Sequence, residues 1–188
     1  MISKPNIKKL AVRKGVRTGY IEKDYVNTWI LYMLYKENWN IDFYFKGGTA
    51  LSKVYQPSLN RFSEDLDFTL GQKPNANITD DIMNSLNSVE RKTGISFDLR
   101  DKHRAENNPN VPGGNIGLKI KYNAILDQSN TTEIDLDWGS KLFFPSKTQS
   151  LAQENYDTPE FKMKTYSLKE IFAEKIRCLF MRPKTRDM

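Results

Sequence analysis

Two segments of the sequence alternate between carboxylates and large apolar residues. In residues 65–68 two aspartates flank Leu66, and in residues 132–138 three acidic side chains alternate with apolar ones. Because successive side chains of a β-strand point to opposite faces, each segment predicts a strand with one apolar face and one acidic face. The fold must therefore bury one face of these strands and leave the carboxylates on the other.

The remaining pattern places helices between and around such strands. The apolar residues at positions 26, 29, 30, 33 and 34 recur at helical spacing and predict a core helix. Strands are expected at 66–70, 95–99 and, as a hairpin, at 116–126 and 132–138, and a short apolar stretch at 41–45 leads into residues 46–49. Helices are expected at 50–55, from about residue 79, and from the capping box at Ser167 to about Phe180.

Length and composition favour one folded domain. The chain has 188 residues, of which 38% are hydrophobic, enough for one sizeable core. The lone Cys178 excludes an intramolecular disulfide, and the lone His103 leaves too little for a Cys/His zinc site or a His-centred triad. No stretch is apolar enough to span a bilayer and no signal peptide is evident, so a cytoplasmic protein is expected.

The charge of the chain permits contact with polyanions. The formal net charge is +6, and lysines and arginines that neutralise phosphates release counterions. Part of this charge lies in residues 1–20, which we interpret as a basic N-terminal arm or a short wing packed on the domain edge. Solvated surface charge would explain the same excess, so the composition alone does not identify a nucleic-acid site.

The acidic face suggests a metal site. Asp65 and Asp67 point to the same side of one strand, and hard carboxylate oxygens suit Mg²⁺ or Mn²⁺. Two-metal phosphoryl transfer uses about three carboxylates, and the second acidic strand can supply the third. We favour Asp135, with Asp137 as the alternative. An exposed strand edge would give the same pattern, whereas a calcium loop starting at Asp65 fails because Leu70 stands where glycine is required.

A glycine turn precedes the first acidic strand. Lys46, Gly47, Gly48 and Thr49 stand at the expected start of a helix, where free backbone N–H groups and the helix dipole favour a phosphate. The motif is neither a Walker loop nor a dinucleotide-binding fingerprint. Taken alone it is weak support for phosphate binding.

Together these motifs resemble a known family. Lys46-Gly47-Gly48-Thr49-Ala50-Leu51, followed by Arg61-x-Ser63-x-Asp65-x-Asp67-Phe68, resembles the AbiEii-type nucleotidyltransferases, toxins of type IV toxin–antitoxin and phage-defence pairs. The resemblance is tight over about residues 43–70 and looser around Asp135, Lys175 and Arg186-Asp187. It implies an α+β, polymerase-beta-like nucleotidyltransferase fold with a mixed sheet and flanking helices, spanning residues 1–188 as a single domain.

The resemblance also implies roles for individual residues. Asp65, Asp67 and Asp135 would hold Mg²⁺ or Mn²⁺, and residues 47–49 with Ser63 would contact a nucleoside triphosphate. Lys46 and Arg61 would assist at the phosphates, and Lys175 would be a phosphate-binding lysine. Alternatively, Lys175 has a structural role, in which the aliphatic part of its side chain lies along the border of its helix and the ammonium reaches water.

The implied partners are a tRNA or other RNA acceptor and a cognate antitoxin protein, with no membrane. Family members typically continue into a further helical region, so the C-terminal helical part is expected to be truncated. Two other functions compete with this interpretation. A glycosyltransferase would need a longer Rossmann-like domain before Asp65, and a catalytically degenerate nucleotide- or RNA-binding module would keep the fold without the transfer.

Overall fold

The computed structural model describes residues 1–56, 64–106, 113–151 and 156–181 as an α+β fold built on one mixed sheet. The strands follow the order β3-β4-β5-β2-β1-β7-β6. Their bounds are β1 Phe43–Lys46, β2 Leu66–Leu70, β3 Ser96–Glu106, β4 Gly114–Asn123, β5 Asn130–Trp138, β6 Lys147–Ser150 and β7 Lys162–Thr165. The helices are α1 Lys4–Lys14, α2 Thr18–Lys36, α3 Gly47–Ala50, α4 Ile78–Thr93 and α5 Leu168–Met181, with a π-helix, η1 Leu51–Tyr55, continuing α3.

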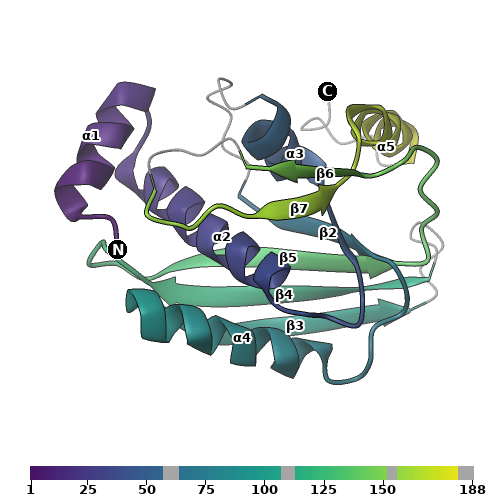
Figure 1. Ribbon diagram of the computed structural model, residues 1–188, viewed down its shortest axis with the longest axis horizontal. Helices are drawn as coiled ribbons and strands as arrows, with labels where there is room; N and C mark the ends of the chain where they lie inside the picture. Colours follow the sequence, from purple (N-terminus) through teal and green to yellow (C-terminus); the bar gives the residue numbers. More distant parts are fainter. Residues whose placement is uncertain (57–63, 107–112, 152–155, 182–188) are drawn as a thin grey trace.

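Two strand pairs run parallel, namely β2 with β5 and β1 with β7, whereas the other neighbours are antiparallel. The β2–β5 pair lies at the centre of the sheet and brings together two strands that are far apart in the sequence (Figure 1). Since parallel pairing cannot be closed by a tight turn, the chain makes α4, β3 and β4 before it returns as β5.

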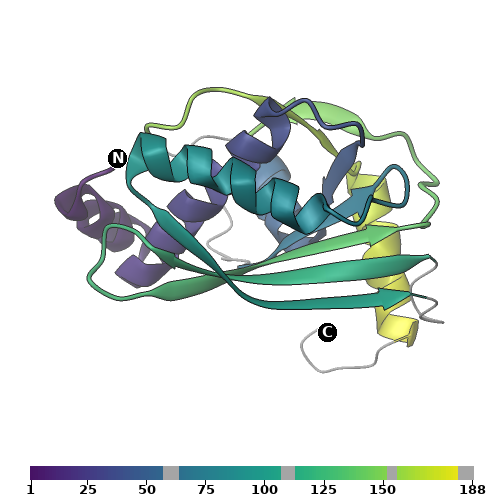
Figure 2. The same cartoon turned by 90° about the horizontal axis from the view of Figure 1, so that it is seen from below.

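One face of the sheet is covered by helices. Figure 2 shows α1, α2 and α4 on the same side of β3, β4 and β5, with α5 at one end of these strands. The apolar face of β2 lies against α2, where the rings of Tyr35 and Phe68 are 6.4 Å apart between centroids. Leu66 and Phe68 on β2, like Ile134 and Leu136 on β5, are fully buried there. The intervening side chains, which include the carboxylates, therefore lie on the opposite face.

The strongest patterns in the sequence predicted their elements correctly. The predicted strand at 66–70 coincides with β2, the helical stripe lies in α2, and the hairpin of β4 with β5 is antiparallel as predicted. Burial follows the same pattern, because α2 buries Val26, Trp29, Ile30, Met33 and Leu34. Strands β6 and β7 were not predicted, because four-residue segments such as Lys147–Ser150 show no apolar alternation.

The N-terminal segment contains a helix that packs on the domain. Residues 4–14 form α1, whose first turn is capped by Ser3 and whose end is set by Gly15 at φ 66°. Ile7, Leu10 and Ala11 are buried, so the segment is part of the packed domain. The described residues contain no helix long and apolar enough to cross a membrane.

Candidate active site

The site is centred on a transverse row of side chains. Lys46 at the end of β1 is paired with Asp67 on β2, and Asp67 is paired with Asp135 on β5. Residues directly opposite on neighbouring strands point to the same face, so three strands present one lysine and two carboxylates side by side. Asp65 lies just before β2, on the same side as Asp67, and its side chain is exposed.

The glycine turn lies directly against this row. Gly47 has φ 77°, and a Cβ at this position would collide with the Oδ2 atom of Asp67. Any L-residue here would be strained by the left-handed backbone and would also displace the carboxylate. The start of α3 is therefore in contact with the aspartate that the sequence assigned to the metal.

Clustering of like charges changes the acidity of these groups. Burial and the neighbouring charges of Asp135 and Asp65 together raise the pKa of Asp67 to about 6, against the opposing effect of Lys46. Burial also raises the pKa of Asp135. Three carboxylates held this close repel one another, so a bound cation would relieve a cost built into the fold.

A second cluster lies beside the first. The Lys46 ammonium donates a short hydrogen bond to Oδ2 of Asp137 and lies 3.4 Å from Oε1 of Glu174 on α5. The other oxygen of Asp137 accepts a hydrogen bond of 2.8 Å from the Thr69 hydroxyl, which in turn accepts one of 2.7 Å from the Tyr166 hydroxyl. This network joins β1, β2, β5 and α5 around one buried lysine.

The protonation states of the second cluster support an ion pair. Burial lowers the pKa of Lys46, but the charges of Asp137 and Glu174 outweigh it, so that the pKa ends above its ordinary value. Burial raises the pKa of Glu174, against the opposing effect of Lys46. Lys46 therefore stays charged and neutralises the two carboxylates that flank it.

The two candidates for the third carboxylate have different surroundings. Asp135 is the register partner of Asp67, whereas Asp137 is the partner of Thr69 and is engaged by Lys46 and by the Thr69 hydroxyl. Asp137 is held by these two donors. Asp135 is thus the carboxylate of β5 that lies next to the Asp65 and Asp67 pair.

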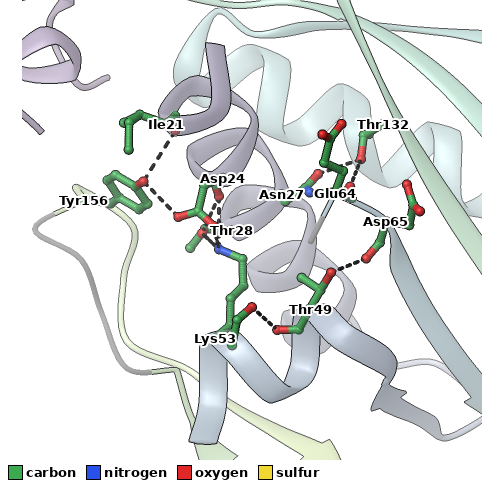
Figure 3. Close-up of polar contacts among 11 residues, drawn as sticks. Ile21, Asp24, Asn27, Thr28, Thr49, Lys53, Glu64, Asp65, Thr132 and Tyr156 are labelled. Carbon is green, nitrogen blue, oxygen red and sulfur yellow. Dashed lines mark hydrogen bonds and ion pairs between the residues drawn. The ribbon is translucent and has the colours of Figure 1, made fainter. Parts of the chain in front are cut away.

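Hydrogen bonds from buried side chains hold the backbone around Asp65 in place (Figure 3). Thr49 donates its hydroxyl to the carbonyl of Asp65 at 2.5 Å, and the Asn27 amide donates to the carbonyl of Glu64 at 3.0 Å. The Asn27 side-chain oxygen accepts a hydrogen bond of 2.7 Å from Thr132 on β5. Asn27, Thr49 and Thr132 are all buried, so α2, α3 and β5 together fix the peptide units that carry Asp65 to its position.

Lys23 and Lys53 extend this support. Lys23 forms an ion pair of 2.7 Å with the Glu64 carboxylate. Lys53, on the π-helix after the glycine turn, lies 2.6 Å from Asp24 and donates to the Thr28 hydroxyl at 2.8 Å. Figure 3 shows the contacts of Lys53 with Asp24 and Thr28 on α2. The helix therefore anchors both the glycine-turn helix and the approach to Asp65.

The donor set of the row fits a hard divalent cation. Among the residues that the structure describes, no three histidine, cysteine, aspartate or glutamate side chains are arranged as a ready-made metal cage. Mg²⁺ requires no such cage, because it usually keeps water and substrate phosphates as ligands beside one or two carboxylates. Asp65, Asp67 and Asp135 supply oxygen ligands of this kind, and their mutual repulsion favours a cation.

Several predicted residues lie elsewhere. Arg61, Ser63, Arg186 and Asp187 are outside the described residues. Lys175 on α5 has an exposed side chain, and it is its neighbour Glu174 that reaches Lys46. The phosphate-binding role of Lys175 stays a prediction.

No pattern in the sequence identifies Glu174, Thr69, Tyr166 or Asn27 as residues of the site. Nothing in their local sequence distinguishes them from ordinary polar residues of a helix or strand. Only their neighbours in the folded sheet reveal them. Thr49 was expected at the triphosphate, and in the structure its hydroxyl donates to the carbonyl of Asp65.

Comparisons with known proteins identify the fold and the family of the chain. A structural relative is MenT4, a nucleotidyltransferase toxin from Mycobacterium tuberculosis H37Rv, with a TM-score of 0.69 at 18% sequence identity. The match covers 94% of this chain and 58% of that one, and it shows a shared nucleotidyltransferase fold. No curated protein matches the sequence. The family model described as "Nucleotidyl transferase AbiEii toxin, Type IV TA system" matches residues 29–188. Because this match spans most of the chain, the protein belongs to the AbiEii family of nucleotidyl transferase toxins of type IV toxin–antitoxin systems.

Proposed function

We propose that this protein is a magnesium-dependent nucleotidyltransferase that transfers a nucleoside monophosphate from a nucleoside triphosphate to a hydroxyl group of an RNA acceptor, such as tRNA. The observation that carries the proposal is the contact of the glycine turn with the carboxylate row. Gly47 lies against Asp67, and Asp67 lies opposite Asp135. A phosphate bound by the turn would therefore lie next to the carboxylates that we propose to bind the cations.

Each residue has a definite part in this reaction. Asp65, Asp67 and Asp135 would hold Mg²⁺, which when bound activates the attacking hydroxyl and stabilises the leaving oxygen. The backbone N–H groups of residues 47–49 would bind the triphosphate at the start of the helix. The acceptor hydroxyl releases its proton to solvent water and its oxygen forms a bond to the α-phosphorus, the bond between that phosphorus and the bridging oxygen breaks, and diphosphate leaves.

Lys46 acts from the side of the site. Its ammonium neutralises Asp137 and Glu174 and is 13% exposed, so it lowers the negative potential of a site that must admit a triphosphate. The net charge of +6 suits an RNA acceptor. By membership of a toxin–antitoxin family, the partner that restrains the protein in the cell would be a cognate antitoxin.

The test is incubation with each α-labelled nucleoside triphosphate, Mg²⁺ and total tRNA. Label should pass to RNA with the parent protein, and Asp65→Ala, Asp67→Ala and Asp135→Asn should each lower the rate at least about 100-fold, because metal ligation contributes several kcal/mol. Glu133→Gln is the matched control, since Glu133 shares the strand and face of Asp135 but pairs with Lys119 at 3.5 Å. Nucleotide binding without transfer by the parent would instead identify a catalytically degenerate module.

A further inference from the structure

The row of paired residues continues past the carboxylates. Asp135 on β5 is paired with Gly117 on β4, and Gly117 is paired with His103 on β3. The complete row therefore runs Lys46, Asp67, Asp135, Gly117, His103 across five strands on one face of the sheet. Its two ends are a buried lysine beside the glycine turn and the lone histidine of the chain.

The imidazole of His103 covers the glycine between it and Asp135. A Cβ built at Gly117 would overlap the ring itself, so the histidine leans over β4 toward the carboxylates and does not point away from the sheet. Gly117 needs no unusual backbone angle, because it is absent from the glycines with positive φ. Its lack of a side chain is what gives the ring its place.

The ring is close enough to Asp135 to act on it electrostatically. Burial raises the pKa of Asp135, and the largest influence that lowers it is His103. The histidine side chain is nevertheless exposed. Figure 2 shows the helices α1, α2 and α4 on the other side of β3 and β4, so among the described elements these helices leave the face of His103 open to a large substrate.

The order of groups along the row matches the order of atoms in a nucleotidyl transfer. The phosphate-binding turn lies at the β1 end, the carboxylates lie in the middle, and His103 lies at the β3 end. In an in-line displacement the attacking and leaving oxygens are on opposite sides of the phosphorus. If diphosphate leaves on the side of Gly47, the attacking hydroxyl must arrive from the side of β4 and β3.

We propose that His103 is the acceptor-binding residue of this site and that its imidazole donates or accepts a hydrogen bond with the ribose of the incoming RNA end. The inference rests on the proposed function and adds the direction from which the acceptor enters. His103 transfers no proton in this scheme. It fixes the ribose so that the hydroxyl faces the α-phosphorus.

The kinetic test separates the two substrates. His103→Ala should raise the KM for tRNA about 3- to 10-fold, the effect of one hydrogen bond, and leave the KM for the nucleoside triphosphate unchanged. His103→Gln, which retains a side-chain amide, should recover part of the loss. Lys102→Ala is the matched control, because Lys102 is the next residue on β3 and points to the other face. An unchanged KM for tRNA in His103→Ala, or an equal rise in both KM values, would overturn the proposal.

A binding experiment decides the same question without turnover. The protein has one histidine, so its imidazole C–H resonances in the NMR spectrum can be followed without assignment. With Mg²⁺ and an α,β-methylene triphosphate analogue present, tRNA ending in a 3′-deoxyribose should shift these resonances in a saturable way, and the analogue alone should not. A shift with the analogue but none with tRNA would reject the acceptor role. A parent protein that binds tRNA at His103 but transfers nothing would refute the proposed function and leave this inference standing.

Discussion

Asp67 on β2 and Asp135 on β5 stand directly opposite each other on parallel strands, and the charge of Asp135 raises the cost of ionising Asp67. Both carboxylates are fixed on central strands of the sheet and not on loops, so they cannot move apart. The repulsion is therefore permanent in the metal-free protein. It is the kind of local cost that functional sites carry at the expense of stability.

The first prediction concerns the stability of the metal-free protein. Asp67→Asn removes one of the three clustered charges while keeping the shape of the side chain, so in EDTA we expect it to stabilise the fold by about 1–2 kcal/mol, or a few degrees in Tm. Addition of Mg²⁺ should raise the Tm of the parent and not that of the variant. Differential scanning calorimetry measures both. Asp101→Asn, at an exposed position on β3, should change neither value; a parent Tm that ignores Mg²⁺ would argue against a metal site.

The second prediction concerns pH. The pKa of Asp67 is raised to about 6 in the folded protein, against about 3.9 in an unfolded chain. The folded state therefore binds an extra proton between about pH 4 and pH 6, and this group makes the metal-free protein more stable as the pH falls through that window. The Tm advantage of Asp67→Asn in EDTA should accordingly shrink between pH 7.5 and pH 5. An advantage that stays constant would mean that Asp67 titrates at its ordinary value.

The third prediction concerns the buried ion pair. Lys46→Met would leave Asp137 and Glu174 without their cation, and breaking a buried pair from one side costs about 3 kcal/mol. Urea unfolding should show this loss. Glu174→Gln should cost less than about 1 kcal/mol, because its 3.4 Å contact is the longer one.

A double substitution is the control for the ion pair. Lys46→Met with Asp137→Asn removes both partners and should be more stable than Lys46→Met alone, with a coupling of at least about 1 kcal/mol. Simple additivity of the two single changes would show that Asp137 draws no stabilisation from Lys46.

The fourth prediction concerns the support of Asp65. Asn27→Ala removes the donor to the Glu64 carbonyl and the acceptor for Thr132, so unfolding free energy should fall by about 1–3 kcal/mol. Mg²⁺ affinity, measured by calorimetry at a temperature where the variant is fully folded, should fall as well. Thr79→Val is the control, because the buried hydroxyl of Thr79 has no hydrogen-bond partner among the described residues. Loss of stability with unchanged Mg²⁺ affinity would limit Asn27 to a structural role.

The fifth prediction concerns the fit of His103 over Gly117. Gly117→Ala places a methyl group where the imidazole lies, so it should lower stability by about 1–3 kcal/mol, as overpacking does. In the His103→Ala background the ring is gone, and the same change should be nearly neutral. Chemical denaturation of the four proteins of this cycle measures the difference. Equal costs in both backgrounds would mean that backbone atoms, and not His103, exclude a side chain at this position.

The sequence predicted the parts of the site better than their arrangement. Alternation in residues 65–68 and 132–138 identified both acidic strands and their apolar faces, since burial on one face imposes that pattern. The parallel pairing of β2 with β5 left no local signal. Without that register the sequence could not decide between Asp135 and Asp137, which differ by two residues and share a face.

Other residues were missed because they act through distant partners. His103 has no motif around it, and its relation to Asp135 exists only through Gly117 on the strand between them. On α5 the apolar side chains of Phe172, Ile176 and Leu179 are exposed among the described residues. The neighbouring Glu174 is identified by the position of Lys46, which lies on the first strand of the sheet.

The insertion of β5 beside β2 also sets the order in which the proposed site can form during synthesis. Long-range pairing between distant segments forms late, because the intervening chain must be closed into a loop first. A chain emerging from a ribosome carries its glycine turn and two aspartates early, but it has no third carboxylate until β5 has docked and no Glu174 until α5 follows. During synthesis the carboxylate row and the Lys46 network are therefore completed only after β5 and α5 have been made.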